Sequence, residues 1–283
     1  MKAMTDLYSG RKRRNAIWTV LAYAATALGL SMLVIILATL LWKGFGGLSL
    51  DVFTKNTAPP GVVGGLLNSI VGSLITTGLG LVIGAPIGIM AGTYLAEYGR
   101  NARLATVVRF INDILLSAPS IVVGLFVYEL LVVPVGHFSA LAGGVALAML
   151  GAPIMVRTTE DMLNLVPDTL REAASSLGMP RSLVIRHIAY KAVRSGIITG
   201  VLLAVARMTG ETAPLIFTAL GNSLFSLDPR GPMSSLPLII YEFARSPYAE
   251  QQALAWTGAL ILTFAVLALS IMARVLSAQT QQK

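Results

Sequence analysis

Residues 18–42 read WTVLAYAATALGLSMLVIILATLLW, and this charge-free stretch decides the class of fold. An α-helix rises about 1.5 Å per residue, so roughly 20 apolar residues cross the hydrocarbon core of a bilayer. The stretch is long enough to span a membrane. It is also longer than the apolar centre of a signal peptide, and it follows the basic run 11–14. We therefore expect an uncleaved first transmembrane helix here.

Further apolar stretches of spanning length follow at residues 66–96, 107–133, 138–157, 195–220 and 252–276. Hydrophobic residues make up 55% of the chain and charged residues only 12%, whereas a soluble domain carries about 25% charged residues. A surface so poor in charge suits contact with membrane lipid rather than with water. The sequence predicts an all-α membrane protein with six transmembrane helices.

Lysine and arginine predict which side of the membrane each loop occupies, because they concentrate in cytoplasmic loops. With a cytoplasmic N-terminus and six crossings, 16 of the 21 basic residues fall in inside segments. The exceptions are Arg207, which lies within a span, and the outer residues Lys43, Lys55, Arg230 and Arg245. We therefore expect both termini, at residues 1–15 and 278–283, in the cytoplasm, and the loops 43–65 and 221–250 outside.

Composition also narrows the chemistry. The net charge of +8 flanks apolar spans without an aromatic and basic patch, so no nucleic-acid partner is expected. The chain has no cysteine, and its two histidines, His137 and His187, lie in different predicted loops. We predict no metal site, no cofactor and no catalytic nucleophile with its base.

Prolines punctuate the predicted spans, at Pro86, Pro119, Pro153 and Pro214. A proline frees a backbone carbonyl and usually kinks a transmembrane helix. Small residues in spans also serve ordinary close packing of helices. Two interpretations stay open, namely routine packing and kinked helices that line a pore.

The longest inside loop, residues 158–194, predicts a short helix at about 169–177. Thr169 and Glu172 have the spacing of a capping box, and Gly178 suits a left-handed helix end. An apolar stripe follows helical spacing along Leu170, Ala173, Ala174 and Leu177. Such a helix needs a surface to pack against, which is its own bundle, the membrane or a partner protein.

The same loop resembles a known family. Glu172-Ala173-Ala174, Gly178 and Ile188 match the spacing of the EAA signature of ABC importer permeases, although Tyr190-Lys191 replaces the usual Leu-Pro. Further stretches resemble PstA-type permeases of phosphate importers, in which a lysine is normal at that place. They are GGLLNSI (64–70), PIGIMAGTYLAEY (86–98), APSIVVGLF (118–126) and RMTGETAPLIFT (207–218). The resemblance runs from about residue 60 to the end.

This resemblance implies a type I ABC importer permease fold in the cell inner membrane, with residues 1–60 as an N-terminal segment and 61–283 as the permease core. It implies that Glu172, Ala173, Ala174 and Gly178 belong to a coupling helix that docks on an ATPase. The implied partners are a PstC-type second permease, two PstB-type ATPases and a PstS-type phosphate-binding protein. No lysine of the chain is followed by Ser or Thr, so the phosphate-binding loop of ATPases is absent and no enzymatic activity is expected.

Arg207 and Glu211 are the charged residues that fall well inside a predicted span, 195–220. A spacing of four residues places both on one face of a helix, and Arg207 lies near mid-depth. They are either a structural ion pair or part of a path for phosphate. A permease for another oxyanion, such as molybdate or sulfate, remains an alternative. A stand-alone ion-coupled transporter is a further one, although it predicts inverted repeats and no docking helix.

Overall fold

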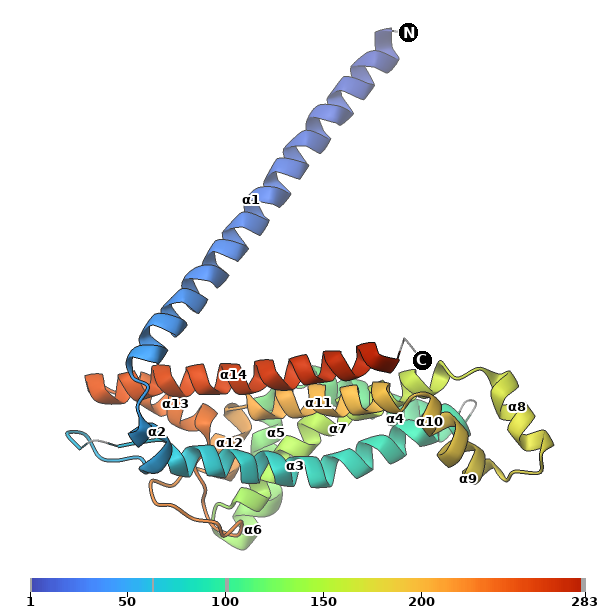
Figure 1. Cartoon of the computed structure of the whole chain (residues 1–283). Coiled ribbons are helices and arrows are strands. Elements are labelled where there is room, and N and C mark those ends of the chain that lie inside the picture. Colours follow the sequence, from blue (N-terminus) through green and yellow to red (C-terminus); the bar gives the residue numbers. More distant parts are fainter. Residues whose placement is uncertain (1, 63, 100–101, 281–283) are drawn as a thin grey trace.

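The computed structural model describes residues 2–62, 64–99 and 102–280, with side chains over 11–62, 64–99 and 102–275. Within these ranges the chain is helical, apart from turns and one isolated β-bridge between Leu220 and Met233. The long helices are α1 (Lys2–Gly46), α3 (Leu67–Thr93), α7 (Ala140–Asn164), α11 (Arg194–Thr209) and α14 (Ala249–Thr280). All except α1 lie side by side in one bundle (Figure 1).

In the described part of the chain, five helical stretches are long and apolar enough to cross a membrane. A sixth candidate is the pair formed by α4 (Arg103–Ser117) and the helical stretch Ser120–Val135, which bends by 108°. That stretch comprises α5 (Ser120–Val127), the π-helical turn η2 (Tyr128–Val132) and α6 (Val133–Val135). The structure thus confirms the predicted all-α membrane architecture, with the third span as a bent pair.

The bend corrects the prediction of one continuous helix over 107–133, and its cause is local. A proline disfavours helical backbone in the residue before it. Ala118, which precedes Pro119, accordingly has an extended backbone with ψ 136°. By contrast, Pro86 and Pro153 lie inside α3 and α7 without ending either helix. Of these three prolines, only Pro119 interrupts a helix.

The centre of the bundle is the packing of α3 against α7. Gly80, Gly84, Gly88 and Gly92 recur every fourth residue along α3, and each lies against α7. A methyl group added at Gly88 would lie 2.7 Å from the Cβ of Met155. Small residues at this spacing let two helix backbones approach closely, as in many membrane-embedded pairs. This stripe makes α3 and α7 one packed unit.

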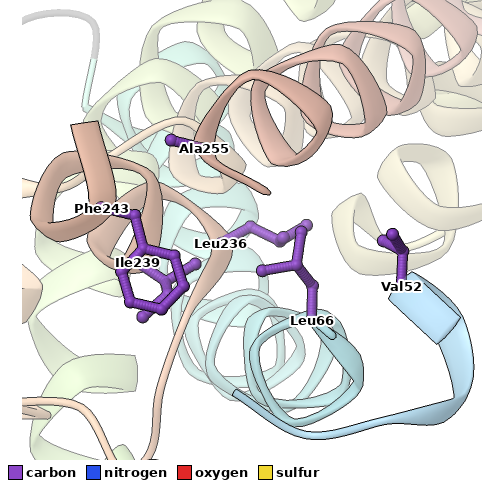
Figure 2. Close-up of a cluster of buried hydrophobic side chains, with 6 residues drawn as sticks. All are labelled: Val52, Leu66, Leu236, Ile239, Phe243 and Ala255. Atoms are coloured by element: carbon purple, nitrogen blue, oxygen red, sulfur yellow. The ribbon is translucent and has the colours of Figure 1, made fainter. Parts of the chain in front are cut away.

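The remaining short elements gather at the two ends of the bundle (Figure 1). At one end, which we call the α8 end, lie η1 (Tyr94–Tyr98), α8 (Asp168–Ser176), α9 (Arg181–Val184), η3 (Ile185–Ala189) and α10 (Tyr190–Ala192). Toward the opposite end lie α2 (Leu50–Thr54), α6 and α13 (Leu236–Ala244). This opposite end has its own apolar core, in which Val52 of α2 and Leu66 pack with side chains of α13 and α14 (Figure 2).

Helix α1 leaves the bundle and projects away from it (Figure 1). Only 6% of its apolar window is buried. Its last turns contact α14, where the Thr257 hydroxyl donates to the carbonyl of Gly44 over 3.2 Å and the rings of Phe45 and Phe264 lie 6.2 Å apart. The predicted first transmembrane helix therefore exists, and its apolar sides face away from the rest of the chain.

Candidate functional site

The fifth predicted span contains a break. Helix α11 ends at Thr209 and α12 (Ala213–Thr218) begins after a connector of three residues, Gly210, Glu211 and Thr212. Pro214 occupies the first turn of α12, where its missing N–H costs nothing. The expectation of one continuous helix over 195–220 is corrected by this connector. Non-helical backbone at membrane depth is tolerated where it is buried in protein or lines a water-filled cavity.

Arg207 lies in the last turn of α11, and Glu211 lies in the connector itself. Glu211 lies beyond the last turn of α11, so the premise that both residues share one helix face is wrong. Their side chains still meet, with Arg207 Nε 3.6 Å from Glu211 Oε1. That distance is too long for a good hydrogen bond. The Arg207 side chain is 51% exposed and that of Glu211 only 16%, so the guanidinium is open to a further partner.

The broken third span packs directly against the broken fifth. A methyl group added at Gly124 of α5 would lie 2.6 Å from the Cα of Pro214 in α12, so only glycine allows this approach. The α5 and α12 stretches are two of those that carry the family resemblance in the sequence. Two half-helices from different spans thus lie side by side next to the Arg207–Glu211 pair.

The second feature is α8, close to the predicted position. Its N-cap is Pro167, and it has no side-chain cap hydrogen bond. The predicted capping box of Thr169 and Glu172 is therefore wrong, because the helix begins one residue earlier and Thr169 already lies inside it. At the other end Gly178 has φ +79°, which confirms the predicted left-handed helix end.

The apolar stripe of α8 is divided between two surroundings. Ala174 is buried, and α8 contacts α9 and η3 of the same chain. Leu170, Ala173 and Leu177 are exposed, Leu177 by 83%. Glu172 is exposed on the same helix. The structure therefore supplies a surface for Ala174 only, and the rest of the stripe faces away from the chain.

Sequence reasoning missed the residue that holds α8 in place, Arg171. Its guanidinium donates to Oε1 of Glu97 over 2.7 Å and to the carbonyl oxygens of Leu163 and Val166 over 2.7 and 2.5 Å. The side chains of Glu97 and Arg171 are 5% and 13% exposed. The available signal was Glu97 itself, a carboxylate directly after a long apolar span and inside a stretch that carries the resemblance.

Two other ion pairs join helices at the same end. Arg109 of α4 lies 2.8 Å from the largely buried Glu160 of α7, and its guanidinium also reaches the carbonyl of Leu95 over 3.4 Å. Arg157 of α7 pairs with Asp113 of α4 over 3.4 Å on the surface. Among the residues described, no group of three or more potential ligand side chains is placed to hold a metal ion.

A family model described as "Binding-protein-dependent transport system inner membrane component" matches residues 84–282. The chain belongs to this family. The permease is 55% identical over 280 residues to the phosphate transport system permease protein PstA of Yersinia pestis, covering 99% of this chain and 95% of that one. It is 53% identical to PstA of Pasteurella multocida over 265 residues, covering 94% and 95% of the two chains.

Solved structures agree on the fold. The permease superposes with a TM-score of 0.58 on a chain of the inward-facing MetNI methionine ABC transporter, at 21% identity, covering 75% of this chain and 93% of that one. It superposes with a TM-score of 0.55 on a chain of an amino acid ABC transporter, at 18% identity, covering 77% and 94%. The permease therefore has the type I ABC importer permease fold. It is a multi-pass inner-membrane component of a transport system and not an enzyme.

Proposed function

We propose that the chain is the transmembrane permease subunit of an ATP-driven importer that moves inorganic phosphate into the cell. The observation that carries this proposal is identity above 50%, over nearly the full length, to permeases named for phosphate transport. The methionine and amino acid transporters share only the fold, and their chains are 21% and 18% identical to this one. Residues 61–283 form the permease core in this proposal, and residues 1–60 supply the first span.

The permease forms half of a pore with a PstC-type subunit, two PstB-type ATPases act on the cytoplasmic side, and a PstS-type protein delivers phosphate outside. Two features support partners of this kind. The sequence lacks the phosphate-binding loop of ATPases, so the energy comes from another chain. Helix α1 also exposes nearly all of its apolar surface, which lipid and a second membrane subunit can cover.

Arg207 and Glu211 belong to the phosphate path in this proposal. A guanidinium matches phosphate through paired, charge-assisted hydrogen bonds. An arginine near mid-membrane costs about 2.5–3.5 kcal/mol on insertion scales, so such a residue is a candidate for a functional role. The contact of 3.6 Å to Glu211 lowers that cost while leaving Arg207 free to exchange partners when an anion arrives.

The exposed face of α8 docks on the ATPase. Glu172 and Ala173 are exposed and make this contact together with Leu170 and Leu177. Ala174 is buried against its own chain and holds α8 in place, while Gly178 ends the helix at an exposed position next to the docking face. The α8 end of the bundle is then the cytoplasmic end. A cysteine at Ala173 should cross-link to a cysteine in the ATPase, and failure of every nearby pair removes the docking proposal.

The function is tested by uptake into proteoliposomes that contain both permeases and both ATPases, with the binding protein outside and ATP inside. We expect ATP-dependent accumulation of radiolabelled phosphate that excess unlabelled sulfate does not reduce. If sulfate competes as well as unlabelled phosphate, the proposed substrate would have to be widened from phosphate to oxyanions in general. Uptake without any ATPase would instead support a stand-alone transporter.

The role of the Arg207–Glu211 pair is tested by comparing Arg207→Gln with the double variant Arg207→Gln and Glu211→Gln. The single variant leaves Glu211 without its cation, whereas the double variant leaves no charge to compensate. If the pair is only structural, the double variant regains transport. If Arg207 serves the anion, the double variant assembles and hydrolyses ATP but stays inactive in uptake. Full recovery of transport in the double variant would contradict the proposal that Arg207 lies on the phosphate path.

A further inference from the structure

The end of α3 is attached to the segment around α8 at three successive places. The Thr93 and Tyr190 hydroxyl oxygens lie 2.6 Å apart, which joins α3 to α10. Glu97 of η1 accepts from Arg171 of α8 over 2.7 Å. The guanidinium of Arg181, the first residue of α9, lies 4.7 Å from the ring centre of Tyr98. These contacts bind the end of the second span to the helices on both sides of the α8–α9 turn.

Arg171 is the central contact because it faces in two directions. Its Nη2 atom donates both to Glu97 and to the carbonyl of Leu163 at the end of α7, each over 2.7 Å. Its Nη1 atom donates to the carbonyl of Val166 and, over 3.1 Å, to Asp168. One planar group therefore joins α8 to α7 and to η1 at the same time. The burial of both partners protects this link from screening by water and salt.

The π-helical turn η1 explains how α3 presents Glu97. Leu95, Ala96 and Glu97 are all buried although they are consecutive, because each packs against a different neighbour. Leu95 contacts the cluster with Ala105, and Ala96 contacts the cluster with Leu163. A π-turn inserts one extra residue into a helix, and such insertions concentrate at functional sites. Here the insertion directs a carboxylate toward the segment that carries α8.

The order of the helices along the chain determines which of them a displacement of α8 can reach through the backbone. Helix α7 leads into α8 through a short connection, and α9, η3 and α10 lead from α8 into α11. A displacement of α8 therefore reaches α7 and α11 along the backbone. It has no such route to α3, which is separated from α8 by α4, α5 and α7. At this end of the bundle, the side-chain contacts of η1 give α8 a direct link to α3, in addition to the packing of α3 on α7.

We propose that Glu97, held by Arg171, is the positioning residue through which the docking helix α8 moves the second span, so that α3 follows α7 when α8 is displaced. The inference rests on the proposed docking of α8 on an ATPase. It assigns Glu97 no contact with phosphate. Its loss should partly separate ATP hydrolysis from transport, because α8 stays docked while the end of α3 follows it less closely and depends on its packing against α7 alone.

The experiment measures phosphate transported per ATP hydrolysed by the complete transporter in proteoliposomes. Glu97→Gln removes the charge that attracts Arg171 but leaves the Arg171 bonds to α7 and Asp168. We expect hydrolysis to persist and the transport ratio to fall by between about twofold and thirtyfold, the range for residues along a coupling route. The control is Glu160→Gln, which removes the charge from the ion pair between partly exposed Arg109 and largely buried Glu160. This pair joins α4 to α7 and reaches the same end of α3 through the carbonyl of Leu95.

In Glu160→Gln, uptake and hydrolysis should fall together with the amount of folded transporter, and their ratio should equal that of the wild type. Equal ratios for Glu97→Gln and the wild type would overturn the proposal, as would a fall of similar size in Glu160→Gln. The double variant Glu97→Gln and Arg171→Gln should remain uncoupled. A restored ratio would mean that a stranded charge, rather than a lost link, caused the defect.

Two further measurements keep the test decisive. If Glu97→Gln does not assemble, Arg181→Gln removes the contact with Tyr98 at an exposed position and should lower the ratio in the same direction. An unchanged ratio in that variant would then overturn the proposal. Cross-linking from position 173 to the ATPase is scored in every sample. Its absence in the wild type defeats the docking itself, whereas its presence with an unchanged ratio in Glu97→Gln defeats only the role of Glu97.

Discussion

Two arginines of this chain, Arg171 and Arg207, differ in their contacts and burial, and we therefore expect different roles for them. Arg171 has short bonds to a carboxylate and to two backbone carbonyls and is nearly buried. Removing one partner of such a pair leaves a buried charge without compensation, which costs about 3–5 kcal/mol. Arg207 has one long contact and a half-exposed side chain. The first arrangement favours a fixed joint, and the second favours an exchange of partners.

Gly178 provides a prediction about the left-handed end of α8. Its φ is +79°, and a Cβ added there would meet nothing within 4 Å. The cost of substitution is therefore conformational, at roughly 1–2 kcal/mol for an ordinary L-residue. We expect Gly178→Val to lower phosphate uptake while membrane insertion stays normal. Uptake in proteoliposomes and the amount of protein in the membrane fraction are the two measurements.

The control for this prediction is Gly178→Asn, because asparagine adopts left-handed backbone more readily than other non-glycine residues. It should retain more uptake than Gly178→Val. If both variants transport like the wild type, the geometry at the end of α8 has no part in coupling. If both are equally inactive, an effect other than backbone conformation is responsible.

At the level of single residues, the sequence predicts features that depend on neighbours along the chain, such as the end of a helix. Gly178 was predictable because a glycine after a short apolar helix commonly ends it. The start of α8 was not, because Pro167 and the spacing of Thr169 and Glu172 give competing signals for the first residue. The contact between Glu97 and Arg171 joins residues 74 positions apart, so only the folded arrangement reveals it.

Among the elements, the glycine stripe of α3 gives a clear prediction about the stability of the packing between α3 and α7. A methyl group at Gly88 would lie 2.7 Å from the Met155 Cβ and 3.0 Å from the Ala152 carbonyl oxygen. Relief requires α3 and α7 to separate slightly, and overpacking of this kind costs about 1–3 kcal/mol. We expect Gly88→Ala to lower the melting temperature of the purified transporter in detergent.

Gly78→Ala on the same helix is the matched control, because its added methyl group would have no atom within 4 Å. Replacing a helical glycine by alanine favours the helix by about 0.5–1 kcal/mol. The melting temperature should therefore stay level or rise. A loss of stability as large as that of Gly88→Ala would show that the close approach of α3 and α7 is not what makes Gly88 sensitive.

The spans themselves were predictable from apolar length, but their breaks were not. Pro86 and Pro119 both lie in apolar surroundings in the sequence, yet α3 continues through Pro86 and the third span bends just before Pro119. A proline alone does not decide between the two outcomes, and the helix after Pro119 also packs on the fifth span, where Gly124 of α5 lies against Pro214 of α12. Hydropathy describes how much of the chain lies in the membrane, whereas such contacts decide where the helices are interrupted.

On the scale of the whole molecule, the chain buries only part of its own apolar surface. The apolar window of α7 is 67% buried, but that of α1 is 6% buried and those of α3 and α14 are each 22% buried. Lipid accounts for part of this exposure. In the proposed assembly, a second membrane subunit would cover a further part of it. The exposed Arg207 belongs to the same pattern, because a half-exposed guanidinium at membrane depth needs water or a protein neighbour rather than lipid.

The arrangement in the membrane is the last prediction, and it depends on whether the bent pair of α4 and α5 crosses. Asn56 follows α2, and Ser182 lies in α9 at the opposite end of the bundle (Figure 1). Between them lie α3, the bent pair and α7. If the pair crosses, these positions are separated by three crossings and face opposite sides. If it returns to the side from which it entered, only two crossings separate them and both positions face the same side.

Cysteine labelling distinguishes these arrangements without background, because the chain has no native cysteine. Both Asn56 and Ser182 are exposed. The excess of basic residues in the loop 158–194 favours a cytoplasmic Ser182. We expect a membrane-impermeant maleimide to label Asn56→Cys in intact cells and Ser182→Cys only after the membrane is opened. Labelling of both from outside, or of neither, would mean that the pair does not cross. Labelling of Ser182→Cys alone would invert the orientation and place the proposed docking face of α8 on the side that lacks ATP.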